Sequence, residues 1–332
     1  NIAVKIKGDH SLNKRSMKKL IDLMKKFGAS FLPKNKYKFP LKLLSSQMPI
    51  GIEYNAGVSA QLKSSVILAG LNSYGLTKII EQVRSRDHTE NLLKRNKKVI
   101  KIHNKEKKVI KLIGKKKLDP FSINVPGDPS SAAFFTALTL LNRNSSLKIK
   151  NVGLNPTRIG FYKILKKQKA KIKFSNLIKE NNEIRGDILI KSCKIKPLKA
   201  SREYYVNSTD EYPILFIIAG LTKGISVFSG IKDLANKESN RITEMQKILK
   251  QVGVKSIASK DKIKIFGRGI FEASDKNIIV QNLGDHRICM SAFILALLTG
   301  AKAKIKNFET VFTSSPSFLK IMKSLGAKFE KN

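Results

Sequence analysis

Residues 236–241 place side chains that could carry chemistry at the start of a predicted helix. Lys237 and Arg241 are cations and Glu238 is a carboxylate, and the apolar residues within 242–252 recur at helical spacing. Backbone N–H groups at a helix start favour an anion, so these side chains could hold an anionic substrate beside an acid–base group. The alternative is an ordinary solvated helix start, and by itself the segment fits that alternative better.

Further polar residues stand where apolar segments begin. Asp210 precedes the almost wholly apolar residues 214–221, where a carboxylate either caps a helix or serves in a site. Arg15, Arg241 and Arg287 each stand at the edge of a predicted helix, and the planar fork of arginine suits phosphate and carboxylate groups. One folded site could collect them with two carboxylates for general acid–base chemistry, although each residue could instead be a cap or a surface ion pair.

These residues lie within a pattern of elements that repeats along the chain. Amphipathic helices, each followed by a short strand, are predicted at 17–27, 161–168, 242–252 and 318–325, with the strands at 28–31, 169–172, 253–254 and 326–329. Ser239 or Asn240 can cap the third of these helices and Gly253 can end it. Buried apolar helices are predicted at 66–71, 132–141, 214–221 and 288–298. The pattern predicts an α/β protein of about four and a half repeated units.

The composition is typical of a globular protein. Hydrophobic residues make up 42% of the 332 residues, and no apolar run reaches the length of about 18 residues that indicates a membrane span. The net charge of +41 raises nucleic-acid binding as a hypothesis. The basic residues are spread along the chain, however, so compositional bias and anionic substrates explain the charge better. Cys193 and Cys289 fit a reducing compartment, and the histidines lack metal-ligand spacing.

A series of short motifs carries a resemblance to a known family. They are Gly-Asp-x-Ser-Leu-x-Lys-Arg-x-Met at 8–17, Ser-Ala-Gln-Leu-Lys-Ser at 59–64, Arg-Asp-His-Thr-Glu at 86–90, Pro-Gly-Asp-Pro-Ser-Ser-Ala at 126–132, Asn-Pro-Thr-Arg at 155–158, Asp-Glu-Tyr-Pro at 210–213, Lys-Glu-Ser-x-Arg at 237–241 and Asp-His-Arg at 285–287. In this order they make the chain similar to the 5-enolpyruvylshikimate-3-phosphate synthase family. None would suffice singly, but jointly they are highly specific.

The resemblance implies a fold and a domain division. The family has two similar domains, each of three βαβαββ units, which together form an inverse α/β barrel of the EPT/RTPC type. Residues 1–124 would be the remaining part of the first domain, and residues 125–332 would be the three-unit second domain. A full-length member would have further units before Asn1, so we expect this chain to lack an N-terminal segment.

The resemblance also implies a reaction and roles for particular residues. The family moves the enolpyruvyl group of phosphoenolpyruvate to the 5-hydroxyl group of shikimate 3-phosphate, releases phosphate, and needs no metal or organic cofactor. Asp210 resembles the residue that accepts the hydroxyl proton, and Glu238 resembles the acid–base group at the methylene carbon. The implied phosphoenolpyruvate contacts are Arg15, Gln61, Arg241 and Arg287. The implied shikimate 3-phosphate contacts are Ser59, Ala60, Gln61, Arg86, Asp210 and Lys237.

Other functions stay open on the sequence alone. The sister enzyme that acts on UDP-N-acetylglucosamine has the same fold, but its reactive cysteine loop has no convincing counterpart here. A basic nucleic-acid-binding protein is less favoured, and a remnant that binds shikimate 3-phosphate without turnover is a third alternative. The favoured expectation is a monomeric, cytoplasmic transferase of aromatic amino acid biosynthesis, with no nucleic-acid partner and no membrane association.

Overall fold

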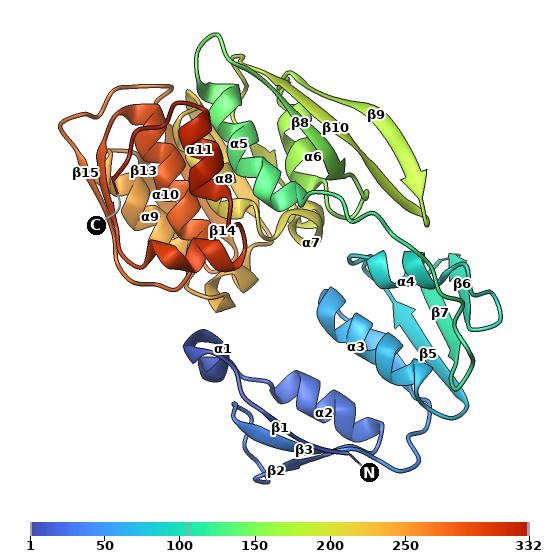
Figure 1. Cartoon of the computed structure of the whole chain (residues 1–332). Helices are drawn as coiled ribbons and strands as arrows, with labels where there is room; N and C mark the ends of the chain where they lie inside the picture. The colour runs from blue at the N-terminus through green and yellow to red at the C-terminus, as the bar shows by residue number, and fades with distance from the viewer. Residues whose placement is uncertain (1, 105, 331–332) are drawn as a thin grey trace. The chain divides into compact units, whose positions relative to one another are not determined.

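The computed structural model describes residues 2–104 and 106–330, and the chain divides into two compact units (Figure 1). The first unit comprises Asn1–Asn124 with Lys179–Glu183, and the second comprises Val125–Ile178 with Ile184–Asn332. We propose that these units are the two domains expected from the sequence, with residues 179–183 belonging to the first rather than the second.

One sheet in each unit shows the repeated order of elements most completely. The strands lie in the order β4-β5-β7-β6 in the first unit and β11-β12-β14-β13 in the second. In each sheet the first two strands are parallel and the remaining neighbours are antiparallel. These strands are β4 (Glu53–Ala56), β5 (Leu76–Glu81), β6 (Ile100–Asn104), β7 (Lys108–Ile113), β11 (Lys199–Ala200), β12 (Gly224–Ser229), β13 (Lys255–Ser259) and β14 (Lys262–Gly267). Parallel strands need a crossover, which α3 (Ala60–Leu71) and α8 (Tyr212–Gly220) supply, so the predicted class of repeated βαβαββ units is confirmed.

The other sheets of the described residues contain parts of the same order. They have the orders β1-β3-β2, β8-β10-β9 and β15-β16. Gly127 bridges in parallel to Val152 on β8, at the position that the first strand of a complete unit takes. The strands are β1 (Ala3–Ile6), β2 (Ser30–Leu32), β3 (Leu41–Leu44), β8 (Ser146–Gly153), β9 (Ile172–Glu180), β10 (Glu183–Lys191), β15 (Asn277–Val280) and β16 (Lys302–Ile305). The internal repeat therefore extends over the whole described chain.

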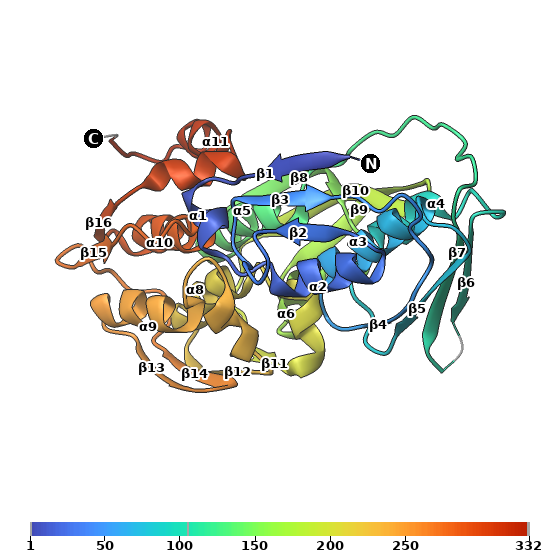
Figure 2. The same cartoon turned by 90° about the horizontal axis from the view of Figure 1, so that it is seen from below.

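Buried helices form the centre of the second unit. α5 (Pro129–Leu141), α8 and α10 (His286–Thr299) are apolar around most of their circumference and pack on one another (Figure 1). A helix that is apolar on every side is stable in water only when its neighbours cover it. α6 (Gly160–Lys167), α9 (Arg241–Gln251) and α11 (Phe318–Ser324) bury one face against this core. In Figure 2, α8 and α9 lie on the same side of sheet β11-β12-β14-β13. The predicted division into buried and half-exposed helices is confirmed for the second unit, whereas the predicted buried helix at 66–71 is only partly buried, with Leu68 57% exposed.

In the first unit, α2 (Lys18–Lys26) has two buried faces. Ile21 packs with Phe31 and Leu41 of the small sheet, whereas Leu23 and the following Phe27 join the cluster around α3. The remaining helices of the described chain are short. They are α1 (His10–Lys14), α4 (His88–Leu93) and α7 (Tyr205–Ser208), with 3-10 turns at Arg202–Tyr204, Lys232–Asn236 and Phe308–Thr313.

The strand predicted at 326–329 is wrong. These residues have no strand conformation, and no described strand pairs with them. Phe329 instead packs against Phe293 of α10, with ring centroids 5.5 Å apart, so its side chain is partly buried without strand pairing. Among the described residues, no helix has the length and apolarity that crossing a membrane would require.

Candidate active site

Arg241, the first residue of α9, is a buried cation surrounded by carboxylates. Only 1% of its surface is exposed. Its Nε donates to Asp285 Oδ2 at 2.9 Å, its Nη2 donates to Glu238 Oε2 at 2.7 Å, and its Nη1 lies 3.8 Å from Asp210 Oδ1. A buried charge is tolerated only when opposite charges surround it. The structure thus brings together Asp210, Glu238 and Arg241, which the sequence singled out separately.

Local capping fixes where Arg241 stands. The side chain of Asn240 accepts a hydrogen bond from the N–H of Thr243 at 3.2 Å, which confirms Asn240 as the cap of α9. The helix ends at Gln251 with Val252 as its C-cap, and Gly253 follows with a φ of +77°, a conformation that glycine adopts most easily. Because α9 begins directly after the cap, Arg241 and Glu238 lie one turn apart at the helix start.

Asp285 is a site residue that the sequence reasoning missed. It caps α10 by accepting the N–H of Arg287 at 3.0 Å, and it also accepts from Ser239 Oγ at 2.9 Å and from Arg241. One buried carboxylate therefore joins the starts of α9 and α10. The signal was a carboxylate immediately before an apolar segment, the same signal that pointed to Asp210.

The surroundings of these groups shift their pKa values. Burial opposes the charge of Asp285, but Arg241 outweighs burial and lowers the pKa of this carboxyl. Burial likewise opposes the charge of Arg241, but Asp285, followed by Glu238 and Asp210, raises its pKa. The ion pair therefore stays charged. Burial and the neighbouring Arg287 lower the pKa of His286 to about 4, so this imidazole is neutral near pH 7.

A chain of hydrogen bonds connects the starts of α5 and α8. Arg158 Nη2 donates to Asp128 Oδ1 at 2.6 Å and to Ser130 Oγ at 2.9 Å, and Ser130 Oγ donates to Glu211 Oε1. Asp128 caps α5, and Glu211 occupies the cap position of α8, one residue after Asp210. Burial, followed by the charge of Asp210, raises the pKa of Glu211. Polar residues therefore gather where the buried helices begin.

Two buried donors at these helix starts are open to an anion. Within the described residues, Nη1 of Arg241 and Nη1 of Arg287 make no hydrogen bond. Arg287 is 9% exposed, and its guanidinium carbon lies 6.0 Å from the ring centroid of Phe134. Lys237 is half-buried and precedes Glu238. The arrangement offers guanidinium donors to an anion beside two partly exposed carboxylates, Asp210 and Glu238, which could exchange protons with it.

The remaining predicted residues lie in the first unit. Ser59 caps α3 by accepting the N–H of Leu62 at 3.4 Å, and Ala60 and Gln61 form the first turn of that helix. Arg86 is half-buried between β5 and α4, and Arg15 is exposed between α1 and α2. Among the described residues, no group of three or more His, Cys, Asp or Glu side chains could hold a metal ion.

Comparison with known proteins decides the family. The family model described as EPSP synthase (3-phosphoshikimate 1-carboxyvinyltransferase) matches residues 1–322. The chain belongs to the EPSP synthase family. It is 38% identical over 322 residues to the 3-phosphoshikimate 1-carboxyvinyltransferase of Petrotoga mobilis, covering 96% of this chain and 73% of that protein. It is 37% identical over 328 residues to that of Zymomonas mobilis subsp. mobilis, covering 97% and 72%.

Solved structures agree with this family. The EPSP synthase structure from Acinetobacter baumannii matches with a TM-score of 0.83 and 33% identity, over 99% of this chain and 74% of that one. The enolpyruvyl transferase NikO from Streptomyces tendae matches with a TM-score of 0.72 at 13% identity, over 98% of this chain and 73% of that one. The second likeness shows that the fold is shared.

Proposed function

We propose that this EPSP synthase family member transfers the enolpyruvyl group of phosphoenolpyruvate to the 5-hydroxyl group of shikimate 3-phosphate and releases phosphate. The observation that carries the proposal is the meeting of Asp210 and Glu238 at the buried guanidinium of Arg241. A cation between two carboxylates suits a reaction in which an anionic substrate must accept and lose protons. The family match over residues 1–322 supplies the substrate class.

The two carboxylates divide the proton transfers between them. Glu238 gives a proton to the methylene carbon of phosphoenolpyruvate, and the neighbouring carbon becomes cationic. The 5-hydroxyl oxygen attacks that carbon while its proton passes to Asp210, which forms a tetrahedral intermediate. Glu238 then takes a proton back from the methyl group as the carbon–oxygen bond to phosphate breaks, leaving the enol ether. Glu238 thus acts once as an acid and once as a base, whereas Asp210 acts as a base and passes its proton to the departing phosphate, which leaves as hydrogen phosphate.

The remaining candidates bind the two substrate anions in this proposal. Arg15, Gln61, Arg241 and Arg287 contact phosphoenolpyruvate, and Ser59, Ala60, Gln61, Arg86, Asp210 and Lys237 contact shikimate 3-phosphate. The Nη1 atoms of Arg241 and Arg287 support the first assignment, because a substrate oxygen would accept a hydrogen bond from a buried donor that makes none among the described residues. The start of α3 at Ser59 supports the second assignment, since N–H groups at a helix start bind phosphate.

A substrate-exchange assay tests the proposal. Phosphate release is measured with both substrates, with each alone, and with UDP-N-acetylglucosamine in place of shikimate 3-phosphate. We expect release only with phosphoenolpyruvate and shikimate 3-phosphate together. Release with the UDP-sugar would identify the sister reaction instead, and binding of shikimate 3-phosphate without any release would contradict turnover by this chain.

We further propose that the protein acts as a cytoplasmic monomer without a nucleic-acid partner. Cys193 and Cys289 are both free thiols, as is usual in a reducing compartment. Light scattering would measure the mass in solution, and titration with labelled DNA at physiological salt would measure binding. A dimer mass, or tight salt-dependent DNA binding, would contradict this proposal.

A further inference from the structure

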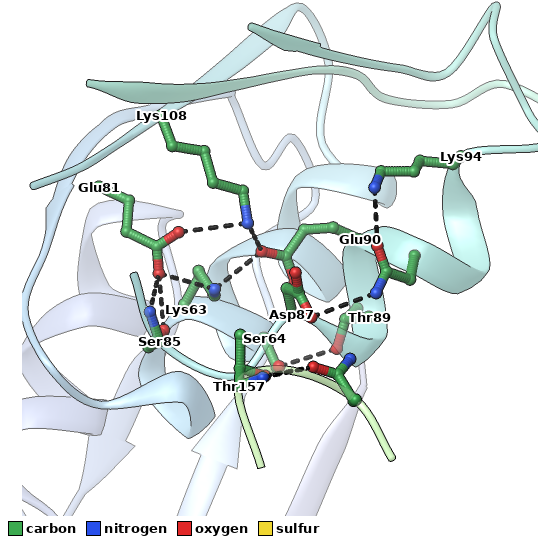
Figure 3. A network of polar contacts seen from close by, with 12 residues as sticks. Lys63, Ser64, Glu81, Ser85, Asp87, Thr89, Glu90, Lys94, Lys108 and Thr157 are labelled. Carbon is green, nitrogen blue, oxygen red and sulfur yellow. Dashed lines mark hydrogen bonds and ion pairs between the residues drawn. The ribbon is translucent and has the colours of Figure 1, made fainter. Parts of the chain in front are cut away.

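Figure 3 shows a cluster of charged side chains that is buried in the first unit. Lys63 Nζ lies 2.8 Å from Glu81 Oε1 and 2.7 Å from Glu90 Oε1. Lys108 Nζ lies 3.3 Å from Glu81 Oε2 and 3.0 Å from Glu90 Oε1. We call Lys63, Glu81, Glu90 and Lys108 the buried ion cluster. Its members come from α3, β5, α4 and β7, so it joins elements that are far apart in the sequence.

The buried ion cluster holds both flanks of Arg86. Ser85 donates its backbone N–H at 2.8 Å and its hydroxyl at 2.7 Å to Glu81 Oε1. On the other side of Arg86, Glu90 is held by both lysines of the cluster. Residues 82–84 are exposed, whereas Ser85 and Glu90 are buried and bonded to the cluster. The backbone position of Arg86 is therefore set by the cluster.

The same cluster reaches the start of α3. Lys63 lies one helical turn after Ser59, and its backbone N–H donates to the carbonyl oxygen of Ser59 at 3.2 Å. The hydroxyl oxygens of the next residue, Ser64, and of Thr89 lie 2.8 Å apart, which adds a second tie between α3 and α4. The helix start at Ser59 and the segment that bears Arg86 are thus held in one fixed relation.

The charges of the cluster are kept despite burial. Burial opposes the charge of Glu81, but hydrogen bonds from Lys63 and Ser85 outweigh it and lower the pKa of this carboxyl. Burial opposes the charge of Lys108, but Glu90 outweighs it and raises the pKa of this ammonium group. A buried ion pair is often no more stabilising than apolar residues of the same volume. Stability alone is therefore a weak reason for the cluster, whereas directional bonds to Ser85 and Glu90 fix geometry.

We propose that the buried ion cluster positions Arg86 and the start of α3 for the phosphate group of shikimate 3-phosphate. The inference rests on the proposed function, in which these groups bind that substrate. Lys63, Glu81, Glu90, Lys108 and Ser85 are positioning residues, because they act through the segments that touch the ligand. Loss of the cluster weakens binding of shikimate 3-phosphate while binding of phosphoenolpyruvate is affected less.

Two variants and a matched control test this inference. Lys63→Met leaves two buried carboxylates to share one lysine, and we expect the Kd and KM for shikimate 3-phosphate to rise about 10-fold or more. Ser85→Ala keeps every charge of the cluster and is expected to fold. We expect it to raise the Kd and KM for shikimate 3-phosphate about 3-fold to 10-fold. Lys78 lies on strand β5, as Glu81 does, but forms a solvent-exposed pair with Glu53 of β4. Lys78→Met should therefore leave both constants unchanged. Calorimetry gives the Kd, and steady-state kinetics give both KM values.

The outcomes separate the two proposals. A larger rise in the KM for shikimate 3-phosphate than in the KM for phosphoenolpyruvate, in both variants and not in the control, supports positioning. Unchanged binding by Ser85→Ala and Lys63→Met overturns the positioning role but leaves the proposed function intact. An equal rise of both KM values together with a lower Tm also overturns it, because that result shows a purely structural role. If the unaltered chain binds no shikimate 3-phosphate, the proposed function fails, and the positioning role fails with it.

Discussion

At the scale of single residues, Asp285 is the side chain that determines how Arg241 is presented. Asp285 accepts a hydrogen bond from Nε of Arg241, whereas Nη1 makes no hydrogen bond in the described residues. One side of the guanidinium is therefore held in place, and the other can donate to a substrate. A neutral side chain of the same shape would leave Arg241 with less compensating charge in a buried position. Truncating one partner of a buried pair is costly for this reason.

We therefore predict that Asp285→Asn lowers the free energy of unfolding by about 3 kcal/mol and raises the KM for phosphoenolpyruvate. Urea denaturation measures the first effect and steady-state kinetics the second. Asp275→Asn is the matched control, because Asp275 forms an exposed pair with Lys276 and its loss should change neither quantity. Wild-type values in Asp285→Asn would contradict the role given to this carboxylate.

His286 predicts a particular pH dependence of stability. Its pKa is about 4 in the folded chain and 6.5 is the ordinary value, so the unfolded chain binds the proton more readily between these values. Stability is therefore highest above the unfolded pKa and falls as the solution is acidified. Between about pH 7 and about pH 5, the protonation of His286 in the unfolded chain should lower the free energy of unfolding by about 2 kcal/mol. His286→Gln should show a correspondingly smaller loss in urea denaturation across this range, and equal losses in both proteins would contradict the assignment.

At the scale of elements, the start of α9 connects local folding to the candidate site. The cap at Asn240 fixes the first turn, and that turn carries Arg241. Asn240→Ala should lower the free energy of unfolding by about 1 kcal/mol, whereas Asn240→Ser keeps a capping oxygen and should remain close to wild type. Thermal or urea unfolding checks both. Equal stability of the two variants would show that the cap contributes nothing.

The elements also show what the sequence could and could not predict. Helix periodicity and capping residues predicted α9 and its cap, and unbroken apolar runs predicted the buried helices α5, α8 and α10. The strand expected at 326–329 is absent because a strand requires a partner, which local pattern does not reveal. The buried ion cluster could not be predicted either. Lys63 and Lys108 resemble the many surface lysines of this chain until the fold places carboxylates beside them.

At the scale of the whole molecule, repetition explains how one chain gathers so many polar residues at helix starts. In the second unit, equivalent buried helices begin at Pro129, Tyr212 and His286, and each is preceded or capped by an acidic residue. Because the helices pack on one another, their starts lie together, and Arg241 and Arg287 supply the opposite charge. The sequence showed the repeat and the individual residues, but only packing showed which of them meet.

The measurement that tests the central claim most directly is phosphate release by the Glu238→Gln variant in the presence of phosphoenolpyruvate and shikimate 3-phosphate. The amide keeps the size of the side chain but cannot exchange a proton, so we predict a turnover about 10²-fold to 10⁴-fold below that of the unaltered chain. Glu244→Gln, within the following helix α9 and paired with Lys247, should retain wild-type turnover. Undiminished release by Glu238→Gln would contradict the claim that this carboxylate, beside Arg241, carries the acid–base chemistry.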